Sequence, residues 1–308
     1  MIKIEKEIKI SELTTLGIGG KVKYFCEAKS ASEVCEAIEF SKKKEVDYFI
    51  LGGGSNVLVS DAGYEGLVIK NRIEDLSEEG NTVRIGAGNN LQELVDLGVK
   101  NGFNGIQKLT MIPGTIGGAI RGNAGAYGAS IGEFVKRVRI IDERLRIKWI
   151  EKIDCEFGYR ESIFKKKKWV IVEGEFEFLA GDKKEIIAEE KGIREQRINK
   201  YPLTLKCPGS FFKNVEVNKV SKEAINKIPK DKIIEGKIPV GYLLEEVGMK
   251  GKTCGAIKIA DYHANLLVNT GNGKAEEVIK LMEMGKNKVW SKFGIEIEPE
   301  VQMVGFEV

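Results

Sequence analysis

Glycine is concentrated in two short regions of this chain, and these regions constrain the fold more than any other feature. The chain has 36 glycines; Gly52-Gly53-Gly54 form one group, and a second group is spread from Pro113 to Gly128. Because glycine has no side chain, its backbone can adopt a positive φ and can lie very close to a ligand or to another backbone segment. Both regions are therefore predicted to be loops whose backbone makes the important contacts.

The first glycine region has the composition of an anion-binding loop. It continues as Ser55-Asn56 and lies between two predicted strands, residues 47–51 and 57–59. Successive backbone N–H groups in such a loop can surround an anion such as a pyrophosphate. The spacing is not G-x-G-x-x-G, and a strand rather than a helix is predicted to follow, so a Rossmann site is not supported. A tight glycine turn without a ligand explains this motif alone equally well.

The second glycine region contains two small-residue segments, Pro113–Ala119 and Gly122–Gly128. Small residues allow the backbone to lie against a flat, rigid ligand such as an isoalloxazine ring. The alternative is a strongly bent, glycine-rich crossover that binds nothing. Two such loops within a few residues, together with the first region, favour ligand binding over packing alone.

Length and charge limit the classes of protein to consider. The chain has 308 residues, enough for two or three compact units, and 42% of them are hydrophobic, which favours a buried core over disorder. The 49 basic and 46 acidic residues give a net charge of only +3. This near-balance argues against a dedicated nucleic-acid binder. An anionic small substrate could still be bound by a few local Lys and Arg side chains.

The cysteines and the apolar segments point to the cytoplasm. The five cysteines are an odd number without C-x-x-C spacing, which is typical neither of a disulfide framework nor of a zinc site. The first residues contain no apolar region of the kind found in signal peptides. No apolar run approaches the roughly 18 residues of a membrane span. We therefore expect a cytoplasmic protein without membrane or nucleic-acid partners.

The hydrophobic pattern predicts an α+β protein. Expected strands are residues 21–28, 47–51, 57–59, 67–70, 82–87, 136–142, 169–178, 210–215 and 264–269, followed by an extended segment over 295–304. Expected helices are residues 31–44 with Ser30 and Glu33 as a capping box, a helix capped by Asn89 or Asn90 and ending before Gly102, 184–200, 239–247 and 275–293. The chain is predicted to divide into residues 1–75, 76–200 and 201–308.

Further segments make the pattern specific, because they match one enzyme family in order. They are Thr15–Gly20, Gly158–Ser162, Gly209–Asn214, His263–Asn265 with Val268-Asn269, and Glu298–Val301. The glycine regions resemble the FAD-binding segments of flavoproteins related to vanillyl-alcohol oxidase and p-cresol methylhydroxylase. With the other segments, almost the whole chain resembles the UDP-N-acetylenolpyruvoylglucosamine reductase family.

This resemblance implies a two-part FAD-binding unit, residues 1–75 and 76–200, followed by an α+β substrate-binding domain, residues 201–308. It implies reduction of a UDP-enolpyruvyl sugar to UDP-N-acetylmuramate in peptidoglycan precursor synthesis, with NADPH as co-substrate. Only nine residues lie between Lys200 and Ser210, which fits the shorter subclass that lacks a tyrosine-bearing loop. Gln302 and Tyr242 stand where the family usually has Arg and Lys, so some cofactor or substrate contacts differ.

The resemblance also implies three catalytic residues. Arg160 would stabilise the enol that forms next to the substrate carboxylate, although an isolated arginine is more often ion-paired at a surface. Ser210 would protonate the substrate's α-carbon, although such a serine alone is usually a turn residue. Glu300 would assist the enol and the proton transfer. Glu298 is the competing carboxylate, and Lys213 is a candidate to polarise the serine hydroxyl.

The binding residues implied by the match fall into two groups. For FAD they are Gly52, Gly53, Gly54, Ser55, Asn56, Pro113, Gly114, Thr115, Ile116, Gly117, Gly118, Asn123, Ala124 and Gly125. For the substrate they are Tyr159, Lys213, Asn214 and Lys250.

Two other features are given no binding role. The run Lys165–Lys168 is interpreted as a solvated loop rather than a phosphate site. His263 is the single histidine; it has no second His or Cys at ligand spacing, so we expect no metal site. It also lies far from the glycine regions in sequence, so we expect non-covalent FAD. We expect a monomer. The alternative functions are a non-catalytic flavin- or nucleotide-binding relative and a flavin oxidase of the wider superfamily.

Overall fold

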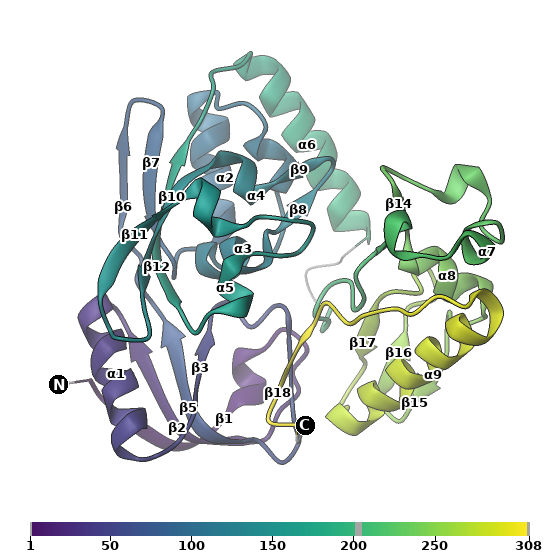
Figure 1. Cartoon of the computed structure of the whole chain (residues 1–308), viewed down its shortest axis with the longest axis horizontal. Coiled ribbons are helices and arrows are strands. Elements are labelled where there is room, and N and C mark those ends of the chain that lie inside the picture. Colours follow the sequence, from purple (N-terminus) through teal and green to yellow (C-terminus); the bar gives the residue numbers. More distant parts are fainter. Residues whose placement is uncertain (1, 201–204, 307–308) are drawn as a thin grey trace. The chain divides into compact units, whose positions relative to one another are not determined.

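The computed structural model describes residues 2–200 and 205–306, and the chain folds into two compact units (Figure 1). The first contains residues 2–8, 22–53 and 65–200, and the second contains residues 9–21, 54–64 and 205–306. Two early segments therefore pack with the C-terminal part of the chain. The predicted division into residues 1–75, 76–200 and 201–308 stays a prediction.

The first unit contains two sheets that share part of a hydrophobic core. The four-stranded sheet has the order β1 (Glu5–Lys9), β2 (Lys21–Ala28), β5 (Tyr64–Asn71), β3 (Tyr48–Leu51). The five-stranded sheet has the order β11 (Ile147–Glu151), β10 (Val135–Ile141), β12 (Val170–Glu177), β7 (Thr82–Gly86), β6 (Leu76–Glu79). Neighbouring strands of the second sheet are all antiparallel, whereas β3 and β5 are parallel.

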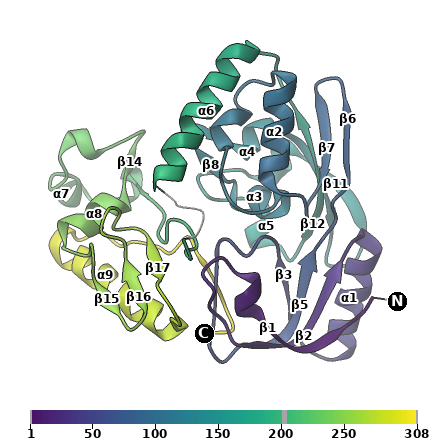
Figure 2. The same cartoon turned by 180° about the vertical axis from the view of Figure 1, so that it is seen from behind.

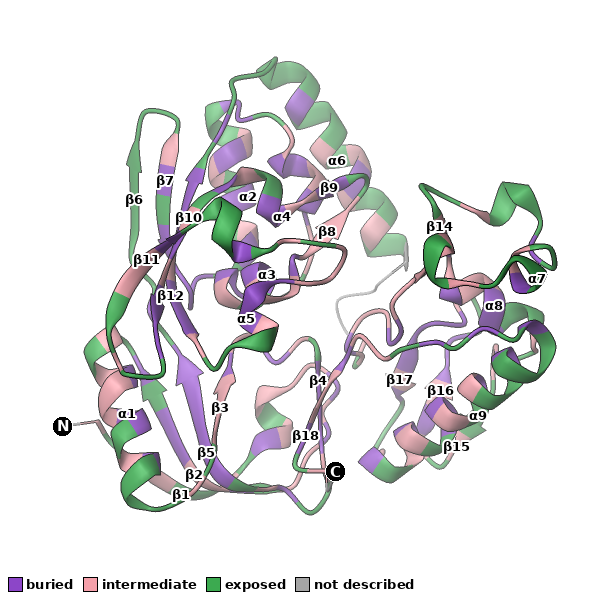
Figure 3. Ribbon diagram, viewed as in Figure 1, coloured by how far each residue is buried: buried purple, intermediate pink, exposed green. Residues whose placement is uncertain are grey.

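Helices cover one side of the five-stranded sheet, and Figure 2 shows α2 and α6 next to each other there. The helices and short strands of this unit are α1 (Ala31–Lys43), α2 (Leu91–Asn101), η2 (Ile106–Leu109), α3 (Ile116–Gly122), β8 (Gly125–Ala126), β9 (Ala129–Ser130), α4 (Ile131–Phe134), η3 (Lys152–Cys155), α5 (Ile163–Lys166) and α6 (Lys183–Lys200). Strand β6 is exposed along its length, while β5 is almost entirely buried (Figure 3).

Local sequence signals explain where these helices begin and end. The Ser30 side chain accepts a hydrogen bond from the Glu33 N–H, but the Glu33 carboxylate accepts from the Lys29 N–H, so only half of the expected capping box forms as predicted. Asn90 caps α2, and Gly102 ends it with φ 74°, a left-handed value that suits glycine. Tyr201 and Pro202, expected to stop the charged helix, lie outside the described residues.

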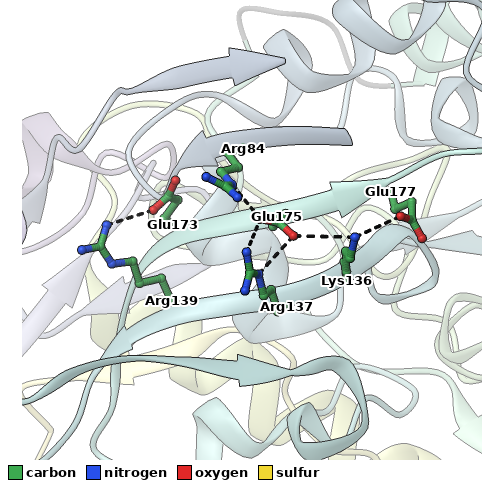
Figure 4. Close-up of polar contacts among 7 residues, drawn as sticks. All are labelled: Arg84, Lys136, Arg137, Arg139, Glu173, Glu175 and Glu177. Atoms are coloured by element: carbon green, nitrogen blue, oxygen red, sulfur yellow. Dashed lines mark hydrogen bonds and ion pairs between the residues drawn. The ribbon is translucent and has the colours of Figure 1, made fainter. Parts of the chain in front are cut away.

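The outer face of the five-stranded sheet carries a row of charged side chains from three strands (Figure 4). Register places Glu175 of β12 directly between Arg137 of β10 and Arg84 of β7. The Glu175 carboxylate lies 2.6 Å from Arg84 Nε and 2.8 Å from Arg137 Nη2. Its side chain is only 3% exposed, so two cations compensate a largely buried anion.

The second unit is built around α9 (Ala275–Phe293), whose apolar stripe of Val278, Leu281, Met282, Val289 and Phe293 is buried as the pattern predicts. Its other elements are η1 (Ile10–Leu13), β4 (Val57–Val59), β13 (Val215–Glu216), η4 (Val217–Lys219), α7 (Lys222–Ile225), η5 (Lys230–Lys232), β14 (Lys237–Ile238), α8 (Val240–Glu246), β15 (Thr253–Cys254), β16 (Ile257–Ile259), β17 (Leu267–Asn269) and β18 (Gln302–Val304). Strands β15, β16 and β17 form an antiparallel sheet, and β18 pairs with β4 in parallel.

Two predictions about regular structure were wrong. Residues 210–215 are not a continuous strand; Ser210 and Phe212 make single bridges to Leu266 and Pro299. The second glycine region is not loop throughout, because α3 occupies its centre. Across residues 2–200 and 205–306, no helix is both long enough and apolar enough to cross a bilayer.

Candidate active site

The two glycine regions contact each other within the first unit. A Cβ atom on Gly53 would lie 2.8 Å from Gly114 Cα, and one on Gly52 would lie 2.6 Å from Thr115 Oγ1. These distances are too short for any side chain, so the glycines are required where one loop approaches the other. Neither Gly52 nor Gly53 has a positive φ, whereas Gly114 has φ 123°. Close approach therefore explains Gly52 and Gly53, whereas the positive φ explains Gly114.

The end of the first glycine region is connected to the segment that carries Glu300, within the second unit. Gly54 has φ 68°, and a Cβ there would lie 2.0 Å from Leu13 O. The Asn56 amide donates a hydrogen bond to Glu300 O at 3.2 Å, and the Gln302 N–H donates to Asn56 O at 3.0 Å. Asn56 thus fixes the backbone around Glu300, in addition to its expected cofactor role.

The second glycine region uses its N–H groups internally. The Ile116 N–H donates to Asn89 O at 2.9 Å, and the Gly117 N–H donates to Ala87 O at 3.0 Å. The Gly118 N–H donates to Thr115 Oγ1 at 3.4 Å. These donors are already engaged, so this region is suited to flat backbone contact rather than to holding an anion. The Ile116 side chain is fully buried, so only its backbone could touch a ligand.

Asn123 joins the second glycine region to the segment around Arg160. Asn123 ends α3 with φ 42°; its Nδ2 donates to Gly158 O at 2.8 Å, and its Oδ1 accepts from the Gly132 N–H at 3.0 Å. Its side chain therefore holds two backbone segments together. The Arg160 guanidinium donates to Gly125 O at 2.8 Å from Nη2. Asn123, Gly125 and Arg160 thus belong to one hydrogen-bonded region.

Arg160 itself has an unusual backbone conformation that neighbouring groups hold in place. Its φ is 54°, a left-handed value that costs energy for a residue with a side chain. Lys165 Nζ donates to Arg160 O at 2.5 Å, and the Tyr159 ring centroid lies 5.4 Å from Arg160 Cζ. The solvated-loop interpretation of the lysine run was therefore wrong for Lys165, which lies on α5 and contacts the segment with the proposed catalytic arginine.

In the second unit, the segment that carries Glu300 is hydrogen-bonded to Phe211, the residue that follows Ser210. The Phe211 N–H donates to Asn265 O at 2.9 Å, and the Glu300 N–H donates to Phe211 O at 2.7 Å. The Asn265 amide, 2% exposed, also bonds to both the N–H and the carbonyl of Phe212. Asn265 therefore positions the residues that follow Ser210. Sequence reasoning placed it in a matching segment but gave it no role.

Burial distinguishes the two candidate carboxylates. Glu298 has a side chain 73% exposed and forms an ion pair with Lys213, with 3.6 Å between Nζ and Oε2. Glu300 is half-buried, and its backbone contacts both Phe211 and Asn56. This environment favours Glu300 as the functional carboxylate. The Lys213 ammonium, by contrast, pairs with Glu298.

The remaining expected substrate residues have structural partners as well. Asn214 Oδ1 accepts the Val240 N–H at 3.2 Å, at the start of α8. Lys250 forms an ion pair with Glu245. A residue that sequence reasoning missed lies under the first glycine region: Lys70, 7% exposed, donates from Nζ to Gly52 O at 2.5 Å. Its only sequence signal is a lysine inside an otherwise apolar strand.

These features fit a dinucleotide cofactor with a diphosphate and a planar ring. The first glycine region offers backbone that lies beside a buried ammonium, which suits a diphosphate. The second offers the backbone of Ile116, Gly117 and Gly118, whose N–H groups are already engaged, which suits a flat ring.

Comparison with known proteins gives the same assignment. The family description "FAD binding domain" matches residues 22–150, and "UDP-N-acetylenolpyruvoylglucosamine reductase, C-terminal domain" matches residues 201–304. Relatives named UDP-N-acetylenolpyruvoylglucosamine reductase include one from Solibacter usitatus, 40% identical over 99% of this chain and 97% of the relative. Another, from Carboxydothermus hydrogenoformans, is 36% identical over 96% of this chain and 92% of the relative.

A solved structure supports the same fold. The crystal structure of UDP-N-acetylenolpyruvylglucosamine reductase from Thermus caldophilus matches 99% of this chain and 100% of its own, with a TM-score of 0.79 and 25% sequence identity. The expected α+β fold, with a two-part FAD-binding unit and a C-terminal domain, is confirmed. The chain belongs to the UDP-N-acetylenolpyruvoylglucosamine reductase family.

Proposed function

We propose that this chain reduces UDP-N-acetyl-3-O-(1-carboxyvinyl)-glucosamine to UDP-N-acetylmuramate, with FAD as cofactor and NADPH as co-substrate. The observation that carries this proposal is the 40% identity to a reductase of that name over 99% of the chain. The hydrogen bond from the Glu300 N–H to the carbonyl of Phe211, the residue after Ser210, also supports it, because an acid must lie near the group that assists it. The reaction would supply a precursor of peptidoglycan.

FAD, when bound, supplies the hydride transfer between NADPH and the enolpyruvyl group. Residues 52–56 would hold its diphosphate, and residues 113–118 with 123–125 would lie along its ring, with Ile116 contributing backbone only. The Asn123 side chain would act by fixing the loops, since both ends of its amide are engaged.

The protein side chains would manage charge and the proton. Ser210 would donate a proton to the substrate's α-carbon after hydride arrives at the neighbouring methylene carbon. Arg160, with a fixed guanidinium, would stabilise negative charge on the enol and carboxylate, and Glu300 would assist. Tyr159, Lys213, Asn214 and Lys250 would contact the substrate. The last three already contact Glu298, Val240 and Glu245, so these contacts would be exchanged or shared on binding.

The test separates reduction of the flavin from reduction of the sugar. Ser210→Ala should bind FAD normally. Its flavin should also be bleached by NADPH at the normal rate in the absence of oxygen, because reduction of the flavin needs no protein acid. Reoxidation by the enolpyruvyl sugar should slow by about 10²–10⁴-fold, the usual contribution of a proton donor. Ser210→Cys should recover part of the rate, since a thiol can also donate a proton.

Ser291→Ala is the matched control, because among the described residues its hydroxyl bonds only Asn287 O, on an exposed part of α9. Rapid-mixing measurements of flavin absorbance follow both half-reactions. Equal slowing of the two halves in Ser210→Ala would indicate a role in folding or flavin placement. Oxygen-driven turnover of an alcohol would favour an oxidase instead, and a purified protein without flavin colour would contradict both flavoenzyme functions.

Location and assembly are part of the same proposal. A UDP-sugar and NADPH are cytoplasmic metabolites, so we place the protein in the cytoplasm and expect it to act as a monomer. Light scattering of the purified holoprotein at micromolar concentration gives its mass directly, and a mass near twice 34.2 kDa would contradict the monomer.

A further inference from the structure

Lys70 is a buried cation with an incomplete set of partners, located directly under the first glycine region. It lies on β5, opposite Leu51 of the parallel strand β3, and its residue is 7% exposed. Its ammonium donates one hydrogen bond, to Gly52 O at 2.5 Å. Within residues 2–200 and 205–306, no carboxylate oxygen lies within ion-pair distance of it. An ammonium has three donors, and a buried charge without a counter-ion is costly.

The peptide that Lys70 contacts also carries the Gly53 N–H. In a trans peptide the C=O and N–H groups point in opposite directions, and no peptide bond in the described chain is cis. With Gly52 O directed to the ammonium, the Gly53 N–H points away from it. The structure gives that N–H no acceptor among the described residues. Lys70 therefore sets the direction of a donor in the loop and, by withdrawing electron density from the carbonyl, strengthens it.

We propose that Lys70 is the positioning residue for the cofactor diphosphate. Its ammonium holds the Gly52–Gly53 peptide so that the Gly53 N–H faces the diphosphate, and its positive charge offsets the two negative charges there. The inference rests on the proposed role of residues 52–56 in FAD binding. It also accounts for a lysine inside a buried strand, because the cofactor supplies the missing counter-ion.

Lys70→Met tests this, because methionine keeps most of the length and removes the charge and the donor. Apoprotein would be titrated with FAD and with riboflavin, which has the ring but no phosphate, and binding followed by flavin fluorescence. FAD affinity should fall about 10- to 100-fold, the range expected for a hydrogen bond to a charged group. Riboflavin affinity should change less than about threefold. Lys70→Arg should recover part of the FAD affinity.

A control and a stability measurement separate this role from a structural one. Lys23→Met removes a partly exposed lysine on β2 of the same sheet, which pairs with Glu65, and should leave both affinities unchanged. Because burying an unpaired ammonium is unfavourable, the Lys70→Met apoprotein should melt at the same temperature as wild type or higher. The added stabilisation by saturating FAD should shrink.

The outcomes are distinct. A lower melting temperature of the Lys70→Met apoprotein, together with an equal loss of FAD and riboflavin affinity, would show that Lys70 has a structural role and would overturn the inference. Unchanged FAD affinity would also overturn it. Gly53→Ala alters the loop itself, so it distinguishes failure of the Lys70 inference from failure of the proposed diphosphate site. If Gly53→Ala weakens FAD binding while Lys70→Met does not, only the Lys70 inference fails. If neither weakens it, residues 52–56 do not hold the diphosphate.

Discussion

Lys70 and Lys165 of the first unit donate hydrogen bonds to backbone carbonyl groups of segments with expected functional roles. Lys70 holds Gly52, in the first glycine region, and Lys165 holds Arg160 at its left-handed φ. A side chain bonded to a carbonyl fixes the path of the main chain. At this scale, placement of the reactive groups depends on residues that need not touch the substrate.

The two glutamates before Val301 provide a residue-scale prediction. Glu300→Gln should lower kcat for the sugar at least about 100-fold, the lower range for a residue assisting proton transfer. Glu298→Gln should change kcat less than about threefold, because its side chain is 73% exposed and its ion pair with Lys213 is open to solvent. Steady-state assays with matched flavin content compare the two. A large loss in Glu298→Gln with a small loss in Glu300→Gln would reverse the assignment.

The contacts that support the candidate site could not be predicted from the sequence. Ser210 and Glu300 were predicted as members of one catalytic set, with Lys213 as the neighbour of the serine, and these roles stay predictions; the bond that the structure shows joins Glu300 to Phe211. The roles of Asn265 and Lys70 were missed because each partner lies on a different segment of the chain, at a distance that periodicity cannot reveal. A buried lysine was visible in the sequence only as an exception to an apolar strand.

At the scale of elements, close packing decides where glycine is needed inside a helix. Gly98 of α2 faces the buried Ile106, and a Cβ there would lie 2.3 Å from Ile106 Cγ2. Gly192 of α6 has nothing within 4 Å of the same position. Glycine lowers helix stability at both positions, so only the first has a packing reason to be retained.

These two glycines give opposite predictions for the same substitution. Gly98→Ala should destabilise the protein by about 1 kcal/mol, because overpacking costs about 1–3 kcal/mol and the gain in helix propensity offsets only part of it. Gly192→Ala should stabilise it by about 0.5–1 kcal/mol. Urea unfolding of both variants measures the free energies. Equal effects would show that the helices relax enough to remove the contact at Ile106.

The charged row on the five-stranded sheet predicts a dependence on pH. Burial raises the pKa of Glu175, but the hydrogen bonds and charges of Arg137 and Arg84 outweigh burial and hold it below its ordinary value of 4.5. Its contribution to stability is therefore present above that value and is lost as pH falls through the folded-state pKa. Glu175→Gln should cost about 1–2 kcal/mol at pH 7, since both arginines remain partly solvated.

The difference between wild type and Glu175→Gln should shrink in acid, as measured by denaturant unfolding from pH 7 to pH 3. Glu177→Gln on the same strand is the matched control, with a side chain 52% exposed and one partner, Lys136. It should cost less than about 0.5 kcal/mol. A constant difference across the pH range would mean that the Glu175 carboxylate is not stabilised by its arginines.

Prediction of elements from sequence succeeded where local signals were strong. The helix Ala275–Phe293 has its predicted bounds, because an apolar stripe and Gly294, with φ 68°, mark its face and its end. Helix α3 was missed because Gly117, Gly118 and Gly122 give it poor helix propensity, and contacts with the rest of the unit stabilise it instead. The strand at 210–215 failed because its hydrogen bonds go to two distant segments.

At the scale of the whole molecule, attachment of the flavin is the first testable property. The single histidine is His263, and its Nδ1 accepts the Asn265 N–H at 3.1 Å in the second unit. Non-covalent FAD should therefore appear in the supernatant after acid precipitation, measured by its absorbance. A coloured pellet would show a covalent bond, and peptide mapping would then identify the attached residue.

The composition of the two units could not be predicted from sequence. The glycine regions and the matching segments indicated domains in consecutive stretches, but residues 9–21 and 54–64 pack with the C-terminal part. This arrangement depends on strand pairing between segments that are remote in the chain, such as β4 with β18. Short apolar segments such as Val57–Val59 carry no information about which partner they will take.

The pairing of β4 with β18 sets a time order for biosynthesis. Val57–Val59 leave the ribosome early, and their partners Gln302–Val304 are made roughly 240 residues later. At about 5–20 residues per second, the early strand waits on the order of 10–50 seconds for the strand that completes its ladder. Throughout that interval an apolar edge is available to other nascent chains and to chaperones. Ribosome-bound chains that end before Gln302 are therefore expected to be the aggregation-prone form of this protein.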